Sequence, residues 1–243
     1  MEWRGMVNVN FHRMVNRSHR LLKFRDHAAT MPSPREQDFS QRPQLLEVDK
    51  WSTSQHLLKL VKIVGYHPFP LDELLLMSAA FQYHRPDIVI DIGTHLGKSA
   101  RVWLELSSYF QTQTTIHTVD ICNPSHPEYP GDRLGEFIRR TPVKQHIGDG
   151  YDCARGLISE NPGAHFLLFL DSDHRYENVR RELELAKMVK RGCLLVHDTF
   201  YQPGSAYNHG PYLAVLDVLR AQPVRQVIHL HAGLPGMSYL GLG

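Results

Sequence analysis

Two acidic residues of the chain each follow an apolar run with the composition of a buried β-strand, and a histidine stands near each of them. Asp171 comes directly after HFLLFL (residues 165–170) with His174 three positions later, and His197 precedes Asp198 after a second apolar run. Because parallel strands end at one edge of their sheet, we expect these four side chains to lie close together. Carboxylate oxygens are the ligands that Mg²⁺ prefers, and an imidazole can accept a proton near neutral pH. The pattern predicts metal-assisted or base-assisted chemistry at that edge.

A glycine-containing turn follows another strand-like run, DIVIDI (residues 87–92). Gly93 and Gly97 allow the backbone to approach a ligand closely, and the helix that follows offers free N–H groups. Their GxxxG spacing differs from the GxGxxG of dinucleotide-binding proteins, so it favours a nucleoside without a pyrophosphate. Asp120 ends the next strand-like run, where a carboxylate can accept hydrogen bonds from both hydroxyls of a ribose.

The elements that must position these residues alternate regularly between strand and helix from residue 87 to residue 221. Such alternation predicts a parallel sheet with helices on both faces. A Gly-Leu-Pro-Gly turn at 233–236 joins the last two strands directly, so that pair must be antiparallel. The expected fold class is α/β, a Rossmann-like doubly wound, mostly parallel seven-stranded sheet with an antiparallel last strand. We expect strands at 87–92, 114–121, 143–147, 165–170, 193–196, 225–231 and 238–242, and helices at 55–64, 71–83, 98–110, 133–140, 151–158, 176–190 and 211–221.

The composition divides the chain into three parts. Residues 1–44 hold eight Lys or Arg against four Asp or Glu, and we expect them to form a basic, flexible leader. Residues 45–85 are expected to form a helical cap near the ligand cleft, and residues 86–243 the ligand-binding domain. The net charge of the whole chain is +2, so the part beyond the leader is slightly acidic, which argues against a nucleic-acid partner.

Cysteine usage and hydropathy bear on the location of the protein. Cys122, Cys153 and Cys193 are too few and too widely spaced for a disulfide framework or a zinc site. No apolar run approaches the ~18 residues of a membrane-spanning helix, and the N-terminus has no apolar signal segment. We therefore expect a cytoplasmic protein without a membrane span. A homodimer is expected only by analogy with other proteins of this fold class.

Several stretches of the chain resemble motifs of a known family. DIGTHLGKS (91–99), IHTVD (116–120) and HIGDGYD (146–152) resemble the first three motifs of class I S-adenosylmethionine-dependent methyltransferases. Residues 170–200 resemble two related groups of small-molecule O-methyltransferases, the cephalosporin hydroxylase-like enzymes and the metal-dependent caffeoyl-CoA and catechol O-methyltransferases. The resemblance implies that S-adenosylmethionine is bound with contributions from Asp91, Gly93, Thr94, Gly97, Ser99, Asp120, Asp149 and Asp173.

The same resemblance implies a metal site. In caffeoyl-CoA-type enzymes a D-x-D-K stretch supplies a metal ligand, a cofactor contact and a basic residue. Here that stretch reads DSDH, so Asp171 would bind Mg²⁺ and His174 would occupy the position of the base. An Asp-Asn pair completes the site in those enzymes, whereas here Asp198 is followed by Thr199. Threonine is a poorer ligand than asparagine, which leaves the third protein ligand open, with His197 as a candidate for that place or for a second catalytic base.

The expected function is transfer of a methyl group from S-adenosylmethionine to a hydroxyl of a small molecule or sugar, assisted by Mg²⁺. Three alternatives stay open. The chain could be a metal-independent N- or O-methyltransferase with a histidine base, or a non-catalytic Rossmann-like binding module. It could also methylate a nucleic acid, although DSDH stands where amino-group methyltransferases of that kind usually show [DNS]PP[YFW]. Asp171 and Asp198 also have a purely structural interpretation, as caps of the loops at strand ends.

Overall fold

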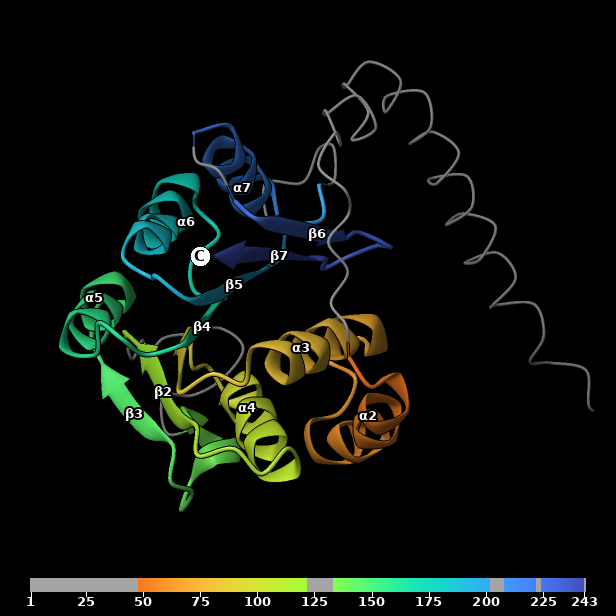
Figure 1. Cartoon of the computed structure of the whole chain (residues 1–243). Coiled ribbons are helices and arrows are strands. Elements are labelled where there is room, and N and C mark those ends of the chain that lie inside the picture. The colour runs from red at the N-terminus through yellow and green to blue at the C-terminus, as the bar shows by residue number, and fades with distance from the viewer. Residues whose placement is uncertain (1–47, 122–132, 202–207, 222–223, 243) are drawn as a thin grey trace, which may run out of the picture. The chain divides into compact units, whose positions relative to one another are not determined.

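A single sheet of seven strands forms the centre of the described structure (Figure 1). The computed structural model describes residues 48–121, 133–201, 208–221 and 224–242, so the predicted leader of residues 1–44 lies outside the described residues. The strand order is β3-β2-β1-β4-β5-β7-β6, and β7 runs antiparallel to both of its neighbours. The predicted fold class is therefore confirmed. The strands are β1 (Ile88–Ile92), β2 (Thr115–Asp120), β3 (Lys144–Ile147), β4 (Phe166–Leu170), β5 (Gly192–His197), β6 (Gln226–Leu230) and β7 (Met237–Leu242).

The central strands are buried on both faces, as their continuous apolar sequences require. Every residue of β1 and of β4 is buried. Side chains alternate between the two faces of a strand, so Val89 and Leu167 enter one hydrophobic core, whereas Ile90 and Leu168 enter the other. The sheet thus separates two apolar cores, each of which must be covered by helices.

Helices supply both covers (Figure 1). Helix α3 packs against one face together with α4, and α2 contacts both of these helices; α5, α6 and α7 cover the opposite face. No helix among the described residues is long and apolar enough to cross a membrane. The α-helices are α2 (Lys50–Val64), α3 (Leu71–His84), α4 (Lys98–Tyr109), α5 (Gly150–Glu160), α6 (Tyr176–Leu183) and α7 (His209–Ala221).

Two of the predicted helices are shorter than expected. The helix predicted at 133–140 is reduced to a 3-10 turn, η2 (Glu136–Ile138). The helix predicted at 176–190 ends as an α-helix at Leu183 and continues as a 3-10 segment, η3 (Glu184–Lys187). The tighter 3-10 winding rotates Leu185 towards the side of Leu183, and both residues are fully buried. Core packing therefore overrides the simple 3.6-residue pattern at this point.

The register of the parallel strands brings their carboxyl ends to one edge of the sheet. Ile92 of β1 lies beside Leu170 of β4, and Leu170 lies beside Val196 of β5. The glycine turn, the DSDH stretch and the His-Asp pair follow these three positions directly. Because β1 separates β2 from β4, chain connections diverge at this place, which is where open α/β sheets bind ligands.

Candidate active site

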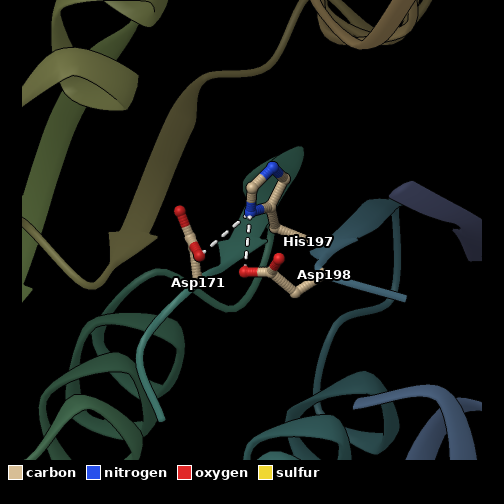
Figure 2. A group of neighbouring side chains, drawn as sticks. All are labelled: Asp171, His197 and Asp198. Atoms are coloured by element: carbon tan, nitrogen blue, oxygen red, sulfur yellow. Dashed lines mark hydrogen bonds and ion pairs between the residues drawn. The ribbon is translucent and has the colours of Figure 1, made fainter. Parts of the chain in front are cut away.

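Asp171, His197 and Asp198 form a cluster at the carboxyl ends of β4 and β5 (Figure 2). The Nδ1 atom of His197 lies 3.2 Å from Asp171 Oδ1 and 3.2 Å from Asp198 Oδ2. His197 and Asp198 are buried, whereas Asp171 is partly exposed. One ligand atom from each of the three residues lies within 4.8 Å of the others, so the cluster can hold a metal ion. The structure thus brings together three of the residues predicted from the sequence.

The other nitrogen of His197 faces a residue that the sequence did not single out. Glu73, on α3, is buried, and its Oε2 lies 2.9 Å from His197 Nε2. Its second oxygen, Oε1, accepts a hydrogen bond of 2.8 Å from the backbone N–H of Gly236, in the turn between β6 and β7. Glu73 therefore connects α3 to the histidine of the cluster and to the turn beside it.

Asp198 is held by two further side chains. His174 Nε2 lies 2.9 Å from Asp198 Oδ2, and the Asn208 side-chain amide donates to Asp198 Oδ1 at 3.3 Å. Asp198 has a φ of +56°, a left-handed backbone conformation that is uncommon for residues other than glycine. Such strain persists only where the surroundings hold it, and these contacts fix the carboxylate that faces His197.

The charges in the cluster stabilise one another. Burial disfavours a charged imidazole at His197, but the charge of Asp171 and the hydrogen bonds of the cluster raise the pKa of His197 well above its ordinary value. Burial likewise opposes protonation of His174, and the bond to Asp198 outweighs it and raises the pKa of His174. Burial disfavours the charge of Asp198 too, yet the two histidines lower the pKa of that carboxyl. The charged forms of these three side chains therefore favour one another.

Thr199, which follows Asp198 where related enzymes have asparagine, is engaged elsewhere. Its hydroxyl accepts a hydrogen bond of 2.8 Å from Ser238 and lies 3.2 Å from His231 Nε2. His197 lies beside the two aspartates with a possible donor atom, whereas the hydroxyl of Thr199 contacts Ser238 and His231; the third ligand stays a prediction.

The glycine turn after β1 lies directly against the DSDH stretch. Gly93 has a φ of +103°, and a Cβ atom built on it would lie 2.1 Å from the backbone oxygen of Asp171. Gly97 has a φ of +82° and is the N-cap of α4. Glycine is therefore required at position 93 on steric grounds. The backbone of the turn packs directly against the backbone of Asp171, a member of the cluster.

Three predicted cofactor-binding side chains face the interior. Asp91, Thr94 and Ser99 are all buried, and the Thr118 hydroxyl donates to Asp91 Oδ2 at 2.7 Å and lies 2.7 Å from Thr94 Oγ1. Burial raises the pKa of Asp91 to about 7. The positions of these side chains under the turn suit a role in shaping it, and their part in cofactor binding stays a prediction.

The remaining predicted acids lie at the surface of the same edge. Asp120 ends β2 and accepts a hydrogen bond of 2.9 Å from the backbone N–H of His95 in the glycine turn. Asp149 caps α5 and pairs with Arg181 at 2.7 Å. Asp173 accepts hydrogen bonds from Arg175 and Asn178, both at 2.6 Å for the shortest contact. Asp149 and Asp173 thus have structural partners, and their predicted cofactor contacts remain untested.

Sequence reasoning missed two members of the site, Glu73 and Asn208. Glu73 stands in a helix of otherwise mostly apolar residues, LDELLLMSAAFQYH, and an acid at a buried helical position was the one available signal. Asn208 precedes α7 and is buried, with its side-chain amide also donating to the backbone oxygen of Pro235 at 2.9 Å. No local pattern in the sequence marks Asn208.

Comparisons with known proteins bear on the fold of the chain and on the kind of domain that it contains. Residues 90–199 match the family model described as a methyltransferase domain. No curated protein matches the chain in a search by sequence. Similar solved structures include an O-methyltransferase from Bacillus cereus in complex with SAH, which is 16% identical with a TM-score of 0.52, over 81% of this chain and 93% of that chain.

Two further structures show the same likeness. The SAH-bound methyltransferase PaMTH1 from Podospora anserina is 14% identical with a TM-score of 0.51, over 82% of this chain and 99% of that chain. The O-methyltransferase TomG from Streptomyces achromogenes, in complex with SAM, is 18% identical with a TM-score of 0.50, over 82% and 92% of the two chains. At such identities the likeness concerns the fold. Residues 90–199 therefore match a methyltransferase domain, and the described part of the chain has the Rossmann-like α/β fold that these solved methyltransferases share.

Proposed function

We propose that this protein transfers a methyl group from S-adenosylmethionine to a hydroxyl group of a small molecule or sugar, with the help of a divalent cation, for which the sequence predicts Mg²⁺. The observation that carries the proposal is the contact between the glycine turn and the cluster, where Gly93 lies against the backbone of Asp171. A cofactor at the turn and a cation at the cluster would be neighbours. Similar O-methyltransferases have been solved with SAM or SAH, which supports the choice of cofactor.

The residues of the chain have distinct roles in this reaction. Asp120, which accepts a hydrogen bond from the glycine turn, would also accept hydrogen bonds from the ribose, and the turn from Gly93 to Gly97 would approach the cofactor with its backbone. Asp171, Asp198 and His197 would hold the cation, which when bound lowers the pKa of an acceptor hydroxyl. Alignment of that oxygen with the methyl group supplies much of the acceleration, because displacement at a sulfonium needs an in-line approach.

His174 is the candidate proton acceptor. It is partly exposed, and its Nε2 lies 2.9 Å from Asp198. A histidine backed by a carboxylate is stabilised once it has taken a proton, which suits a general base. His174→Gln would keep a polar side chain of similar size but remove the nitrogen that accepts the proton.

A second candidate mechanism uses no metal. The contact between His174 and Asp198 needs no cation, and a neutral His174 held in this contact can act as the base. This mechanism would suit a metal-independent N- or O-methyltransferase. Sensitivity to a chelator separates the two mechanisms.

The decisive experiment is calorimetric titration of S-adenosylmethionine into the protein, in Mg²⁺ and in EDTA, followed by an acceptor screen in both buffers. The proposal expects micromolar binding of the cofactor in either buffer and methyl transfer that EDTA abolishes. Asp171→Asn and Asp198→Asn should lose transfer while Asp152→Asn, at an exposed position of α5, keeps it. Transfer that survives EDTA and Asp171→Asn but is impaired by Asp198→Asn would establish the metal-free mechanism, and absence of cofactor binding would refute both mechanisms.

The division of the chain is also proposed on the basis of its sequence. Residues 1–44 would form a basic leader, residues 45–85 a helical cap and residues 86–243 the methyltransferase domain. A cytoplasmic location and a homodimer stay predictions of the same kind.

A further inference from the structure

One of the three possible metal ligands in the cluster is a nitrogen atom, and ligand type influences which cation a site prefers. Two of the three donors, from Asp171 and Asp198, are carboxylate oxygens, whereas the third, His197 Nδ1, is an imidazole nitrogen. Mg²⁺ is a hard cation that prefers oxygen ligands, whereas imidazole suits divalent transition metals. The residues present therefore fit a borderline cation such as Co²⁺, Fe²⁺ or Zn²⁺ better than they fit Mg²⁺.

The separations between donors suit a shared ion. His197 Nδ1 lies 3.2 Å from one oxygen of each aspartate (Figure 2). Ligands at adjacent corners of an octahedral cation with bonds of about 2.1 Å lie roughly 3 Å apart. The three donors come from two neighbouring strand ends; two of their three separations already have this spacing, and all three atoms lie within 4.8 Å of one another. A modest rearrangement would therefore let all of them reach one cation.

Glu73 orients the histidine for this role. Its Oε2 lies 2.9 Å from His197 Nε2, and in a neutral ring that hydrogen bond places the proton on Nε2 and leaves the lone pair of Nδ1 facing Asp171 and Asp198. Histidines that bind metals commonly donate their other N–H to a carboxylate in this way. Glu73 is itself fixed by the N–H of Gly236 and is buried at 2% exposure, so it cannot turn away without leaving two donors unpaired.

We propose that Glu73, His197, Asp171 and Asp198 form a carboxylate–histidine–metal site that selects a divalent transition metal over Mg²⁺. His197 is a ligand, and Glu73 is a positioning residue that acts through it. The inference rests on the proposed function in that it assigns a cation to the same site, but it makes a claim about cation selectivity that can be tested without any acceptor.

The test compares Co²⁺ with Mg²⁺ on the full chain, by calorimetry and by the visible absorption of bound Co²⁺. We expect one Co²⁺ per chain, bound at least ~100-fold more tightly than Mg²⁺. His197→Asp, which restores an all-oxygen donor set, should reduce that ratio at least ~10-fold while Mg²⁺ binding is kept. The control is His117→Asn, on β2 and outside the cluster, which should leave the ratio unchanged. A control at another histidine is needed because the chain has 16 histidines, and Co²⁺ could bind to those outside the cluster.

Glu73→Gln tests the positioning role. Glutamine has a single acceptor oxygen, so it cannot serve both His197 Nε2 and Gly236 N–H, and Co²⁺ affinity should fall about 10- to 100-fold. Thermal unfolding of each variant establishes that it is folded.

If His197→Asp fails to fold, pulsed EPR of Mn²⁺ bound to the unaltered protein tests whether His197 is a ligand, because a coordinated imidazole gives a ¹⁴N coupling. His174→Gln should retain that coupling.

Three results would overturn the inference: equal binding of Co²⁺ and Mg²⁺, an unchanged ratio in His197→Asp, or an absent nitrogen coupling. The same samples are titrated with S-adenosylmethionine. If the protein binds S-adenosylmethionine but has equal affinity for Co²⁺ and Mg²⁺, the proposed metal selectivity is rejected and the proposed methyl transfer is not. Conversely, the expected ratio without cofactor binding would support the metal site and reject the proposed function.

Discussion

Glu73 and His197 are 124 residues apart in the sequence, and their side chains meet in a buried contact of 2.9 Å. Both side chains are 2% exposed. The contact joins α3 to the carboxyl end of β5, so the helix that precedes the sheet in the chain contributes directly to the geometry of the cluster. A charged pair in such surroundings is costly to break, because the remaining partner is left buried and unpaired.

Glu73→Ala should therefore destabilise the fold strongly. Breaking a buried pair costs about 3–5 kcal/mol, which corresponds to a fall of about 10 °C in melting temperature for a chain of this size. Asp72→Ala is the matched control, because Asp72 lies in the same first turn of α3 but is not fully buried. Its loss should cost less than about 1 kcal/mol. Thermal unfolding followed by circular dichroism measures both, and equal melting temperatures would show that the pair has no net stabilising effect.

The sequence predicted the parts of this site that follow from strand order. Asp171, His197 and Asp198 each follow an apolar run, and the parallel register then brings such positions together at one edge. The same reasoning predicted the antiparallel pairing of the last strands, since a short turn cannot join parallel ones. These inferences succeed because they depend on local apolar patterns and on a rule of sheet topology.

The sequence could not predict contacts that cross the fold without a local pattern. Glu73 meets His197 because α3 packs over the carboxyl end of β5, and nothing near either residue encodes that packing. Asn208 reaches Asp198 from the start of α7 in the same way. The short α6 is a related case, because the burial of Leu185 is decided by the neighbouring core and not by the helical period.

Asp91→Asn should change the pH dependence of stability. Burial raises the pKa of Asp91 from 3.8 to about 7, so between these values the folded state holds a proton that the unfolded state has released. Stability contributed by this group is therefore lost as the pH rises from about 4 to about 7, by roughly 4 kcal/mol in total. Asparagine stays neutral and can still accept the hydrogen bond from Thr118. Urea unfolding at pH 5 and pH 8 should show a smaller fall for the variant, and parallel curves would contradict the expectation.

Gly93→Ala should disrupt the junction between the glycine turn and the cluster. The added Cβ would meet the backbone oxygen of Asp171 at 2.1 Å, and the φ of +103° disfavours any side chain. We expect a loss of several kcal/mol of stability and weaker binding of S-adenosylmethionine. Gly156→Ala in α5 is the control, because its Cβ would meet nothing within 4 Å. That change should stabilise the protein by about 0.5–1 kcal/mol, since alanine favours helix. Denaturant unfolding of both variants should give shifts of opposite sign.

Asp120→Ala should weaken cofactor binding without unfolding the protein. Asp120 ends β2, is partly exposed, and has one oxygen occupied by the N–H of His95 in the glycine turn. If its carboxylate also accepts the ribose hydroxyls, as proposed, the loss of bonds to a charged group at about 1.5–3 kcal/mol each should raise the Kd for S-adenosylmethionine about 10- to 100-fold or more. Asp152→Ala removes an acid of α5 that pairs with Arg155 and Arg181 at the surface, and should leave the Kd within about twofold. Calorimetric titration of both variants decides the matter: a Kd for Asp120→Ala equal to that of the control would place the ribose elsewhere on the sheet edge.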